Sequence, residues 1–184
     1  GSNVQRKMDI AIEISAVLAF SAINNGDKVG LVLFSDQIEK VVPPKKGRTH
    51  VLRLIKELYT TQPTGSGTRI ADALSYVNRL LDRRAIVVLA SDFQDSDFEK
   101  QLKITNQKHD LVSIVIHDPF EDEIPEIGIV PFRDAETNTE ILIDTSNAKV
   151  RNAYKKRRLL HKKRLEDSLL KMKVDSVNVT TNQS

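Results

Sequence analysis

The chain has 184 residues, of which 40% are hydrophobic and 29% are charged, and its formal net charge is +3. This length suits one domain with one sizeable core, and the composition excludes a largely disordered chain. The absence of cysteine excludes disulfides, thiolate metal sites and a cysteine nucleophile, and it is compatible with a cytoplasmic location, which we expect.

The first part of the chain is predicted to alternate between helix and strand. An apolar helix is expected over residues 5–24, ending at Asn25-Gly26-Asp27. The continuous apolar run Val29–Phe34 favours a strand buried on both faces, as in a parallel sheet. Residues 38–42 alternate between apolar and polar side chains, which predicts an edge strand that ends before Pro43.

The middle of the chain repeats this alternation. Apolar residues at helical spacing predict helices over residues 51–59, 70–81 and 96–108. Short apolar runs predict buried strands over residues 85–90 and 111–116. Alternating helices and buried strands favour an α/β fold, with a mostly parallel central sheet and helices on both faces.

The pattern changes in the last third. Residues 129–132 and 140–143 flank the polar residues 134–139, which is typical of a hairpin. A long helix is expected over residues 147–172, and a last strand over residues 174–179.

The long helix is strongly basic. It carries nine Lys and Arg and no acid between Asn147 and Leu165, whereas the rest of the chain has 19 basic and 25 acidic residues. Such a segment can neutralise phosphates, which makes nucleic-acid binding a hypothesis. It has only one aromatic residue, Tyr154, and no nucleic-acid-binding motif nearby. A solvated helix face, or a dock for an acidic protein, is the preferred interpretation.

Three loops are candidates for a binding site, because parallel sheets bind ligands at the carboxyl ends of their strands. They are Ser35-Asp36, Gly65–Thr68 and Ser91–Asp95. Thr68 and Asp92 supply a hydroxyl and a carboxylate, which are ligands that suit Mg²⁺. Both residues also have a structural interpretation, as caps or turn residues of the helices that follow. The candidates for contact with a partner are Ser35, Asp36, Ser66, Gly67 and Asp95.

An ordered set of segments carries a family resemblance over nearly the whole chain. The segment Ala19–Asp36 resembles the first helix and second strand of von Willebrand factor A domains, and Gly67–Leu74 and Val88–Phe93 resemble the second and third metal-site loops of that family. The resemblance is strongest to the bacterial members associated with MoxR-type ATPases, which are catalogued as a domain of unknown function. Segments like His117–Glu121, Asp134–Thr137 and Ile143–Ser146 also occur in that group.

This resemblance implies a Rossmann-like von Willebrand A domain that binds proteins and is not an enzyme. It further implies a metal-ion-dependent adhesion site, in which Thr68 and Asp92 are two of the ligands and a partner's carboxylate completes the coordination of Mg²⁺. The implied partner is a MoxR-type ATPase, and the implied process is protein assembly or maturation. In agreement, the chain lacks the Gly-x-Ser-x-Gly pattern of a hydrolase nucleophile.

The chain departs from the family at its beginning. The family's first metal loop, Asp-x-Ser-x-Ser after a central first strand, has no counterpart here. We therefore expect residues 1–184 to be one domain from an N-terminally truncated piece of a longer protein, with weak or absent metal binding. A missing strand would leave an unpaired sheet edge, through which two copies of the chain could dimerise. No apolar stretch reaches the length of a membrane span.

Overall fold

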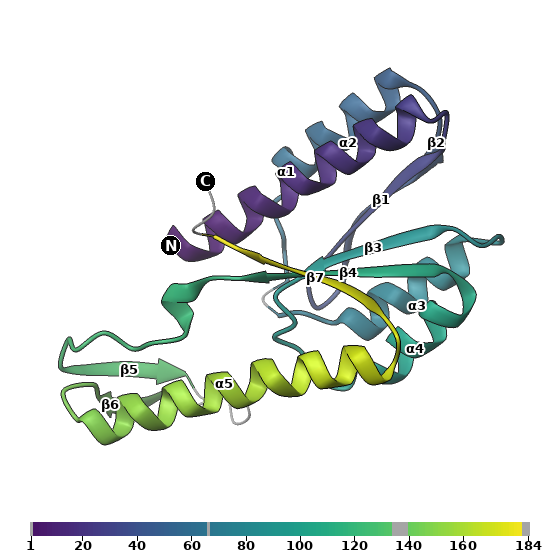
Figure 1. Ribbon diagram of the computed structural model, residues 1–184. Coiled ribbons are helices and arrows are strands. Elements are labelled where there is room, and N and C mark those ends of the chain that lie inside the picture. The colour runs from purple at the N-terminus through teal and green to yellow at the C-terminus, as the bar shows by residue number, and fades with distance from the viewer. Residues whose placement is uncertain (1, 66, 134–139, 182–184) are drawn as a thin grey trace.

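Helices and strands alternate along the computed structural model, which describes residues 2–65, 67–133 and 140–181 (Figure 1). The helices are α1 (Ser2–Asn24), α2 (Arg48–Thr60), α3 (Ile70–Leu80), α4 (Glu99–Lys108) and α5 (Ala148–Lys171), with a short 3₁₀ helix, η1 (Pro119–Glu121). The strands are β1 (Val29–Phe34), β2 (Ile38–Lys45), β3 (Ile86–Ser91), β4 (Asp110–His117), β5 (Ile129–Arg133), β6 (Glu140–Asp144) and β7 (Asp175–Thr180). The predicted elements are therefore all present, with shifted ends.

The strands of the described residues form three sheets. The strands β3, β4 and β7 form a parallel sheet in the order β3-β4-β7, while β1-β2 and β5-β6 are antiparallel pairs. A parallel sheet whose strands are connected through helices is the Rossmann-like α/β arrangement. The predicted fold class is confirmed.

The parallel sheet has helices on both faces. Figure 1 shows α3, α4 and α5 on one side of β3 and β4, and α1 on the other. On the first side lies the main core of the molecule, which includes Val87 and Leu89 of β3, Leu102 of α4 and Leu165 of α5. Apolar side chains at alternate strand positions thus line one face, as expected for a sheet packed against helices.

A second, smaller core lies between α1, α2 and the β1–β2 pair. Its buried members are Ala19, Val42, Val51 and Leu54. Their spacing along α2 explains why this segment is helical, since Val51 and Leu54 recur on one face. We refer to the two clusters below as the main core and the second core.

The strands β1 and β3 do not belong to one sheet, although both were expected in the mostly parallel central sheet. The predicted two-sided burial is wrong for β1, which pairs antiparallel with β2 and is only half-buried. It is also wrong for β3, where Ile86 and Val88 are 73% and 40% exposed. The strand β1 pairs with β2 on one edge, and β3 pairs with β4 on one edge. Within the described ranges no strand pairs with the other edge of either strand. Figure 1 shows that β1 and β3 diverge. Dimerisation through such an edge stays a prediction.

The two prolines do not end β2. The strand continues to Lys45, so the prediction of a stop before Pro43 is wrong. The register of the β1–β2 pair shifts between Val29 and Leu31, opposite the two prolines. Such an irregularity lets an edge strand contain prolines, which cannot donate a ladder hydrogen bond. A Cβ atom on Gly30 would lie 2.9 Å from Pro44 Cγ. The glycine therefore gives β1 room for the proline ring.

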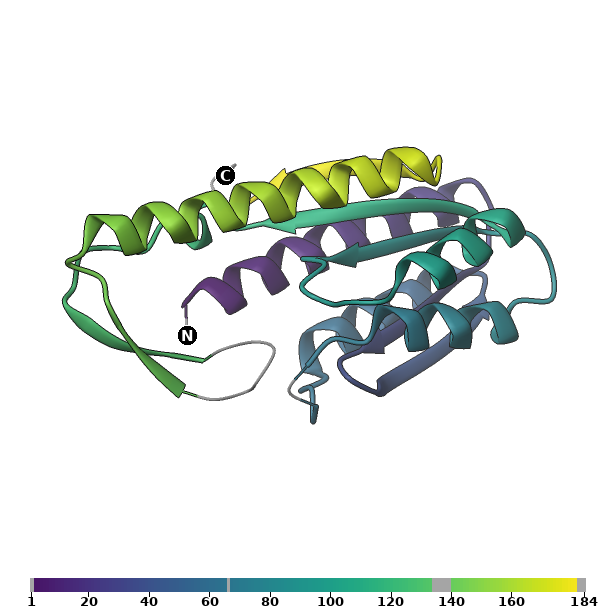
Figure 2. The same ribbon diagram turned by 90° about the horizontal axis from the view of Figure 1, so that it is seen from below.

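The C-terminal part forms an arm beside the parallel sheet. Figure 2 shows the β5–β6 pair and the first half of α5 extending away from the other elements. Asn147 caps α5, since its side chain accepts a hydrogen bond of 2.9 Å from Lys149 N. The two strands pair as predicted, and the turn at residues 134–139 lies outside the described residues. Among the described residues no helix is both long and apolar enough to cross a membrane.

One histidine is buried without a hydrogen-bond partner. His109, which follows α4, is 2% exposed, and neither ring nitrogen has a partner. Burial lowers its pKa from the ordinary value of 6.5, and the neighbouring Lys108 and Arg84 lower it further. Protonation of His109 is therefore unfavourable in the folded protein.

We expect the free energy of unfolding to fall as the pH is lowered below 6.5, where the unfolded chain protonates His109 and the folded chain resists. Urea unfolding at pH 7 and at pH 5 measures this effect. Between the two pH values the free energy of unfolding should fall less in His109→Leu than in the wild type. His161→Gln is the control, because that side chain is exposed. An equal fall in the free energy of unfolding in the wild type and in His109→Leu would contradict the lowered pKa of His109.

Candidate functional site

The three candidate loops are joined by hydrogen bonds into one surface. Arg69 N donates to Ser35 O at 2.9 Å, which connects the Gly65–Thr68 loop to the end of β1. Ile70 N donates to Asp95 Oδ2 at 2.7 Å, which connects the same segment to the loop after β3. The loops are distant in sequence, and these bonds hold their backbones in a fixed relation.

Glu39 fixes the Gly65 side of this surface. Its carboxylate accepts hydrogen bonds from Ser35 Oγ at 2.5 Å, Gly65 N at 2.9 Å, Thr64 N at 3.0 Å and Thr64 Oγ1 at 2.8 Å. The hydrogen bond from Ser35, followed by that from Gly65 N, lowers the pKa of Glu39 from 4.5 to about 2. The carboxylate therefore stays ionised and keeps these donors in place.

Thr68 and Asp92 lie on the wall of one cavity. Its volume is about 180 Å³, and it lies where the ends of β1 and β3 meet α1. The sequence placed Asp92 directly after a strand and Thr68 in the loop before the helix at Ile70, and the structure brings the two residues together. The other residues of the wall are Lys7, Ala11, Phe34, Ala90, Ser91 and Ile116.

Neither candidate ligand is a helix cap. The N-cap of α3 is Arg69, without a side-chain cap, and α4 begins only at Glu99. The role of cap for α3 falls to Asp95, whose carboxylate accepts from Ile70 N and from Ser96 N. A carboxylate is favourable there, because the first turn of a helix has unpaired N–H groups and a positive dipole end.

The remaining candidates differ in exposure. Asp36 and Gly67 are exposed and can contact a partner directly. Ser35 is 7% exposed and bonds to Glu39, so it supports the loop from beneath. Ser66 lies outside the described residues.

Lys7, which no sequence pattern singled out, is the counter-ion of Asp92. Lys7 Nζ lies 2.7 Å from Asp92 Oδ2 and 2.7 Å from Glu121 Oε1. Burial lowers the pKa of Lys7, but the hydrogen bonds from its ammonium to the two carboxylates outweigh this, and the pKa is raised above 10.5. Lys7 lies in the apolar helix, 85 residues before Asp92, and no spacing rule connects the two.

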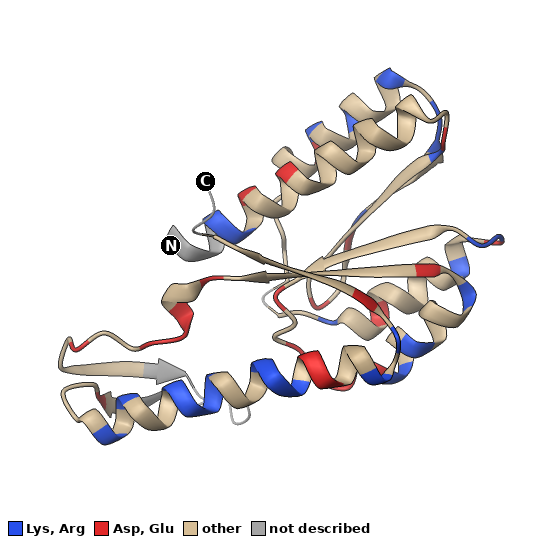
Figure 3. Cartoon of the chain, viewed as in Figure 1, with Lys and Arg blue, Asp and Glu red and all other residues tan. Residues whose placement is uncertain are grey.

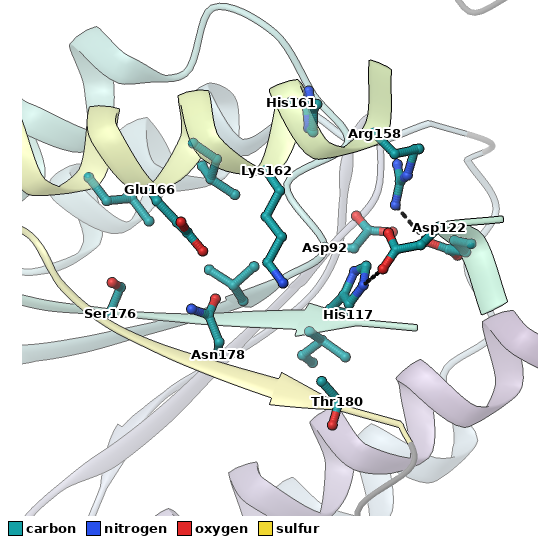
Figure 4. A pocket seen from close by; sticks show the side chains of 15 residues that line it. Asp92, His117, Asp122, Arg158, His161, Lys162, Glu166, Ser176, Asn178 and Thr180 are labelled. Carbon is teal, nitrogen blue, oxygen red and sulfur yellow. Dashed lines mark hydrogen bonds and ion pairs between the residues drawn. The ribbon is translucent and has the colours of Figure 1, made fainter. Parts of the chain in front are cut away.

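A second cavity of about 50 Å³ lies between α5 and the strands β4 and β7. Asp92 lines this cavity as well (Figure 4). Near one end of the cavity His117 Nε2 lies 2.7 Å from Asp122 Oδ2, and Arg158 pairs with Glu121 at 3.3 Å. Both basic and acidic side chains line this second cavity, so its wall does not carry charge of a single sign.

The described residues do not fit a divalent metal ion by themselves. Mg²⁺ takes about six oxygen ligands, whereas the side chains that line the larger cavity offer one carboxylate, that of Asp92, and the hydroxyls of Thr68 and Ser91. Both oxygens of Asp92 are already engaged, Oδ2 with Lys7 and Oδ1 with Gln94 N. In the part of the chain that the structure describes, no three His, Asp or Glu side chains are grouped so as to hold a metal ion.

Comparison with solved structures supports the fold. The chain is similar to the conserved hypothetical protein BatB from Bacteroides thetaiotaomicron, with a TM-score of 0.56 and 17% identity over 94% of this chain and 80% of that one. It is equally similar to an aerotolerance-related membrane protein from Bacteroides fragilis, with a TM-score of 0.56, 16% identity and the same coverage. At such identities the likeness concerns the fold alone.

Relatives by sequence come from mycobacteria. An uncharacterized protein of Mycobacterium tuberculosis, Rv1480, is 26% identical over 140 residues, which is 74% of this chain and 44% of the relative. The uncharacterized protein MAV169 of Mycobacterium avium is 31% identical over 126 residues, 66% of this chain and 73% of the relative. The chain thus spans less than half the length of the first of these relatives. The model of the family described as "Protein of unknown function DUF58" matches residues 1–164, and the chain belongs to that family.

Proposed function

We propose that this chain is a protein-binding module without enzymatic activity, and that its binding face is the surface formed by the three joined loops. The observation that carries the proposal is the set of bonds from Arg69 N to Ser35 O and from Ile70 N to Asp95. They hold exposed groups, including Asp36 and Gly67, on a preformed surface. A surface that is ordered before binding loses less conformational entropy when a partner docks.

The partner that the family resemblance implies is a MoxR-type ATPase, and the role is assembly or maturation of proteins in the cytoplasm. In a von Willebrand A domain a metal ion bound at this face would take a carboxylate from the partner. Thr68 and Asp92 would supply two ligands for Mg²⁺, and the other ligands would come from outside the described residues. The shared cavity of Thr68 and Asp92 supports this arrangement.

A binding experiment with a purified MoxR-type ATPase from the same organism tests the proposal. We expect biolayer interferometry to show that Asp36→Ala and Thr68→Ala each weaken binding by about ten-fold or more, or about 1.4 kcal/mol. Lys103→Ala is the control, because Lys103 is an exposed residue of α4, away from the three loops. Binding that is unchanged in both loop variants would exclude this surface as the interface.

Metal dependence is tested separately, by calorimetric titration of Mg²⁺ and Mn²⁺. We expect weak binding at most in the wild-type chain and none in Asp92→Ala, because Asp92 is the carboxylate of the cavity. If Asp92→Ala binds either metal as well as the wild type does, the metal lies elsewhere.

Nucleic-acid binding is the second candidate, and the charge of α5 favours it. Figure 3 shows Lys and Arg along the first part of this helix. Lys149, Lys156 and Lys163 are exposed and recur every seven residues, so they lie on one face. Other basic residues of the segment pair with acids, as Lys155 does with Glu123 and Arg151 with Glu126. Binding to unrelated DNA sequences that weakens steeply with salt would support this function.

A further inference from the structure

One face of α5 carries a row of lysines that stand apart from the acidic residues of the molecule. Lys149, Lys156 and Lys163 are exposed, and their seven-residue spacing places them in line along the helix. The row is about 21 Å long, because an α-helix rises about 1.5 Å per residue. In the ranges that the structure describes, none of the three lysines pairs with an acidic side chain. Their positive charge therefore faces the solvent.

The acidic residues close to α5 lie on its other sides. Glu123 pairs with Lys155, and Glu121 pairs with Arg158. Successive residues of a helix are about 100° apart, so Lys155 and Arg158 point in other directions than Lys156 does. The first acidic residue within α5 is Glu166, which comes after the row of lysines. The charge of the row is thus not compensated by these neighbours.

Exposed leucines lie within the same row. Leu159 is 67% exposed and Leu160 is 46% exposed. The two leucines follow Lys156 by three and four residues, and they precede Lys163 by four and three residues, so these four side chains share one face. We call this face, formed by Lys149, Lys156, Leu159, Leu160 and Lys163, the outer face of α5.

The combination of lysines and leucines favours a lipid surface over a nucleic acid. Lysines are attracted to anionic headgroups, and leucines beside them can enter the boundary between headgroups and acyl chains. A nucleic acid also attracts lysines, but single strands bind in addition by stacking their bases on aromatic side chains. Tyr154, the only Phe, Tyr or Trp residue of α5, is instead directed towards the protein, where its hydroxyl donates to Glu121 O at 3.0 Å.

The outer face is accessible to a flat surface. In Figure 1 α5 forms one edge of the molecule, and among the described elements none lies beyond it. Figure 2 shows the first half of the helix extending away from the parallel sheet with the β5–β6 pair. A bilayer can therefore approach the whole row of lysines without meeting another element first.

We propose that the outer face of α5 binds the surface of an anionic lipid bilayer. The three lysines contact the headgroups, and Leu159 and Leu160 insert between them. This face is separate from the surface formed by the three joined loops, and the proposal does not depend on the partner proposed for those loops.

Sedimentation with lipid vesicles tests the proposal. We expect the wild-type chain to bind vesicles that contain phosphatidylglycerol but not vesicles of phosphatidylcholine alone, and the binding should weaken as salt is added. The triple variant Lys149→Gln/Lys156→Gln/Lys163→Gln should bind the anionic vesicles about ten-fold or more weakly. Failure of the wild-type chain to bind the anionic vesicles would overturn the proposal.

A second triple variant controls for net charge. Lys28→Gln/Lys45→Gln/Lys46→Gln removes the same charge from exposed lysines around β1 and β2, in the part of the molecule that contains the second core. We expect it to bind anionic vesicles like the wild type. If both triple variants lose affinity equally, the attraction comes from net charge and not from the outer face of α5, and the proposal is wrong.

The leucines allow a test that separates a lipid surface from a nucleic acid. The chain has no Trp, so Leu160→Trp introduces a single fluorescent reporter on the outer face. We expect its emission to shift to the blue on anionic vesicles and to be quenched by lipids with brominated acyl chains. Tyr59→Trp, at a residue of α2 that is 63% exposed, should show neither effect. Unchanged emission of Leu160→Trp, or tighter binding of the wild type to unrelated DNA than to the anionic vesicles, would overturn the proposal.

Discussion

Replacement of Phe93 by alanine is expected to lower the free energy of unfolding by about 3–5 kcal/mol. Phe93 is 0% exposed in the main core, and its ring meets that of Phe98 edge-on, with centroids 5.4 Å apart. Its backbone has a φ of 53°, a left-handed conformation that is unfavourable for a bulky side chain. Burial of the ring outweighs this strain, so removing the ring both opens a void and releases the loop that carries Asp92.

Urea unfolding measures the loss, and Phe120→Ala provides a matched control. Phe120 is 61% exposed, and Arg6 lies 5.8 Å from its ring centroid. Its truncation should cost about 1 kcal/mol at most. Similar losses in the two variants would mean that Phe93 does not anchor the loop. If Phe93 does anchor it, the resonances of Asp92 and Gln94 should also shift in Phe93→Ala.

Replacement of Gly65 by alanine is expected to cost about 1–3 kcal/mol, because the new methyl group would displace the Ser35 hydroxyl, which is buried and bonded to Glu39. A Cβ atom at this position would lie 1.8 Å from Asp36 Oδ1 and 2.2 Å from Ser35 Oγ. The clash would also pull Gly65 N away from Glu39, whose carboxylate it now donates to at 2.9 Å. We therefore expect weaker partner binding in addition to lower stability.

Gly67→Ala is the control, since it lies two residues further along the same loop. A Cβ atom there would meet Asp36 Cβ at 3.5 Å, an ordinary contact. The expected change in the free energy of unfolding, measured in urea, is within about 0.5 kcal/mol. If both variants behave alike, then the side chains of Ser35 and Asp36 make room for a methyl group at position 65 without loss of stability.

Most of the fold could be predicted because its elements depend on local patterns. The helix at residues 70–81 followed from apolar residues at helical spacing, and the structure has it at Ile70–Leu80. Burial of β4 followed from its apolar run and is confirmed. The exposure of Ile86 and Val88 in β3 could not be predicted, because it depends on which strand pairs with that edge and not on the residues themselves.

The site could be predicted in part for a similar reason. Asp92 follows directly from the rule that ligands bind at the carboxyl ends of strands, and Thr68 was singled out by its loop of small residues, Gly65–Thr68. The contribution of Lys7 could not be foreseen, because its helix was interpreted from apolar spacing, which carries no information on the partner of a lysine. Asp95 was expected to contact a partner, and its bond to Ile70 N shows that it also caps α3 from another loop.

The existence of two cores has a consequence for how the molecule opens. The main core and the second core are connected by few contacts, among them Phe34 packed against the main core, the bond from Arg69 N to Ser35 O, and the pair of Lys7 with Asp92. Regions that share few contacts tend to unfold as separate cooperative units. The larger cavity lies between them, since Phe34 and Lys7 line it from one side and Asp92 from the other. A ligand held there would stabilise both units at once and make their unfolding a single event.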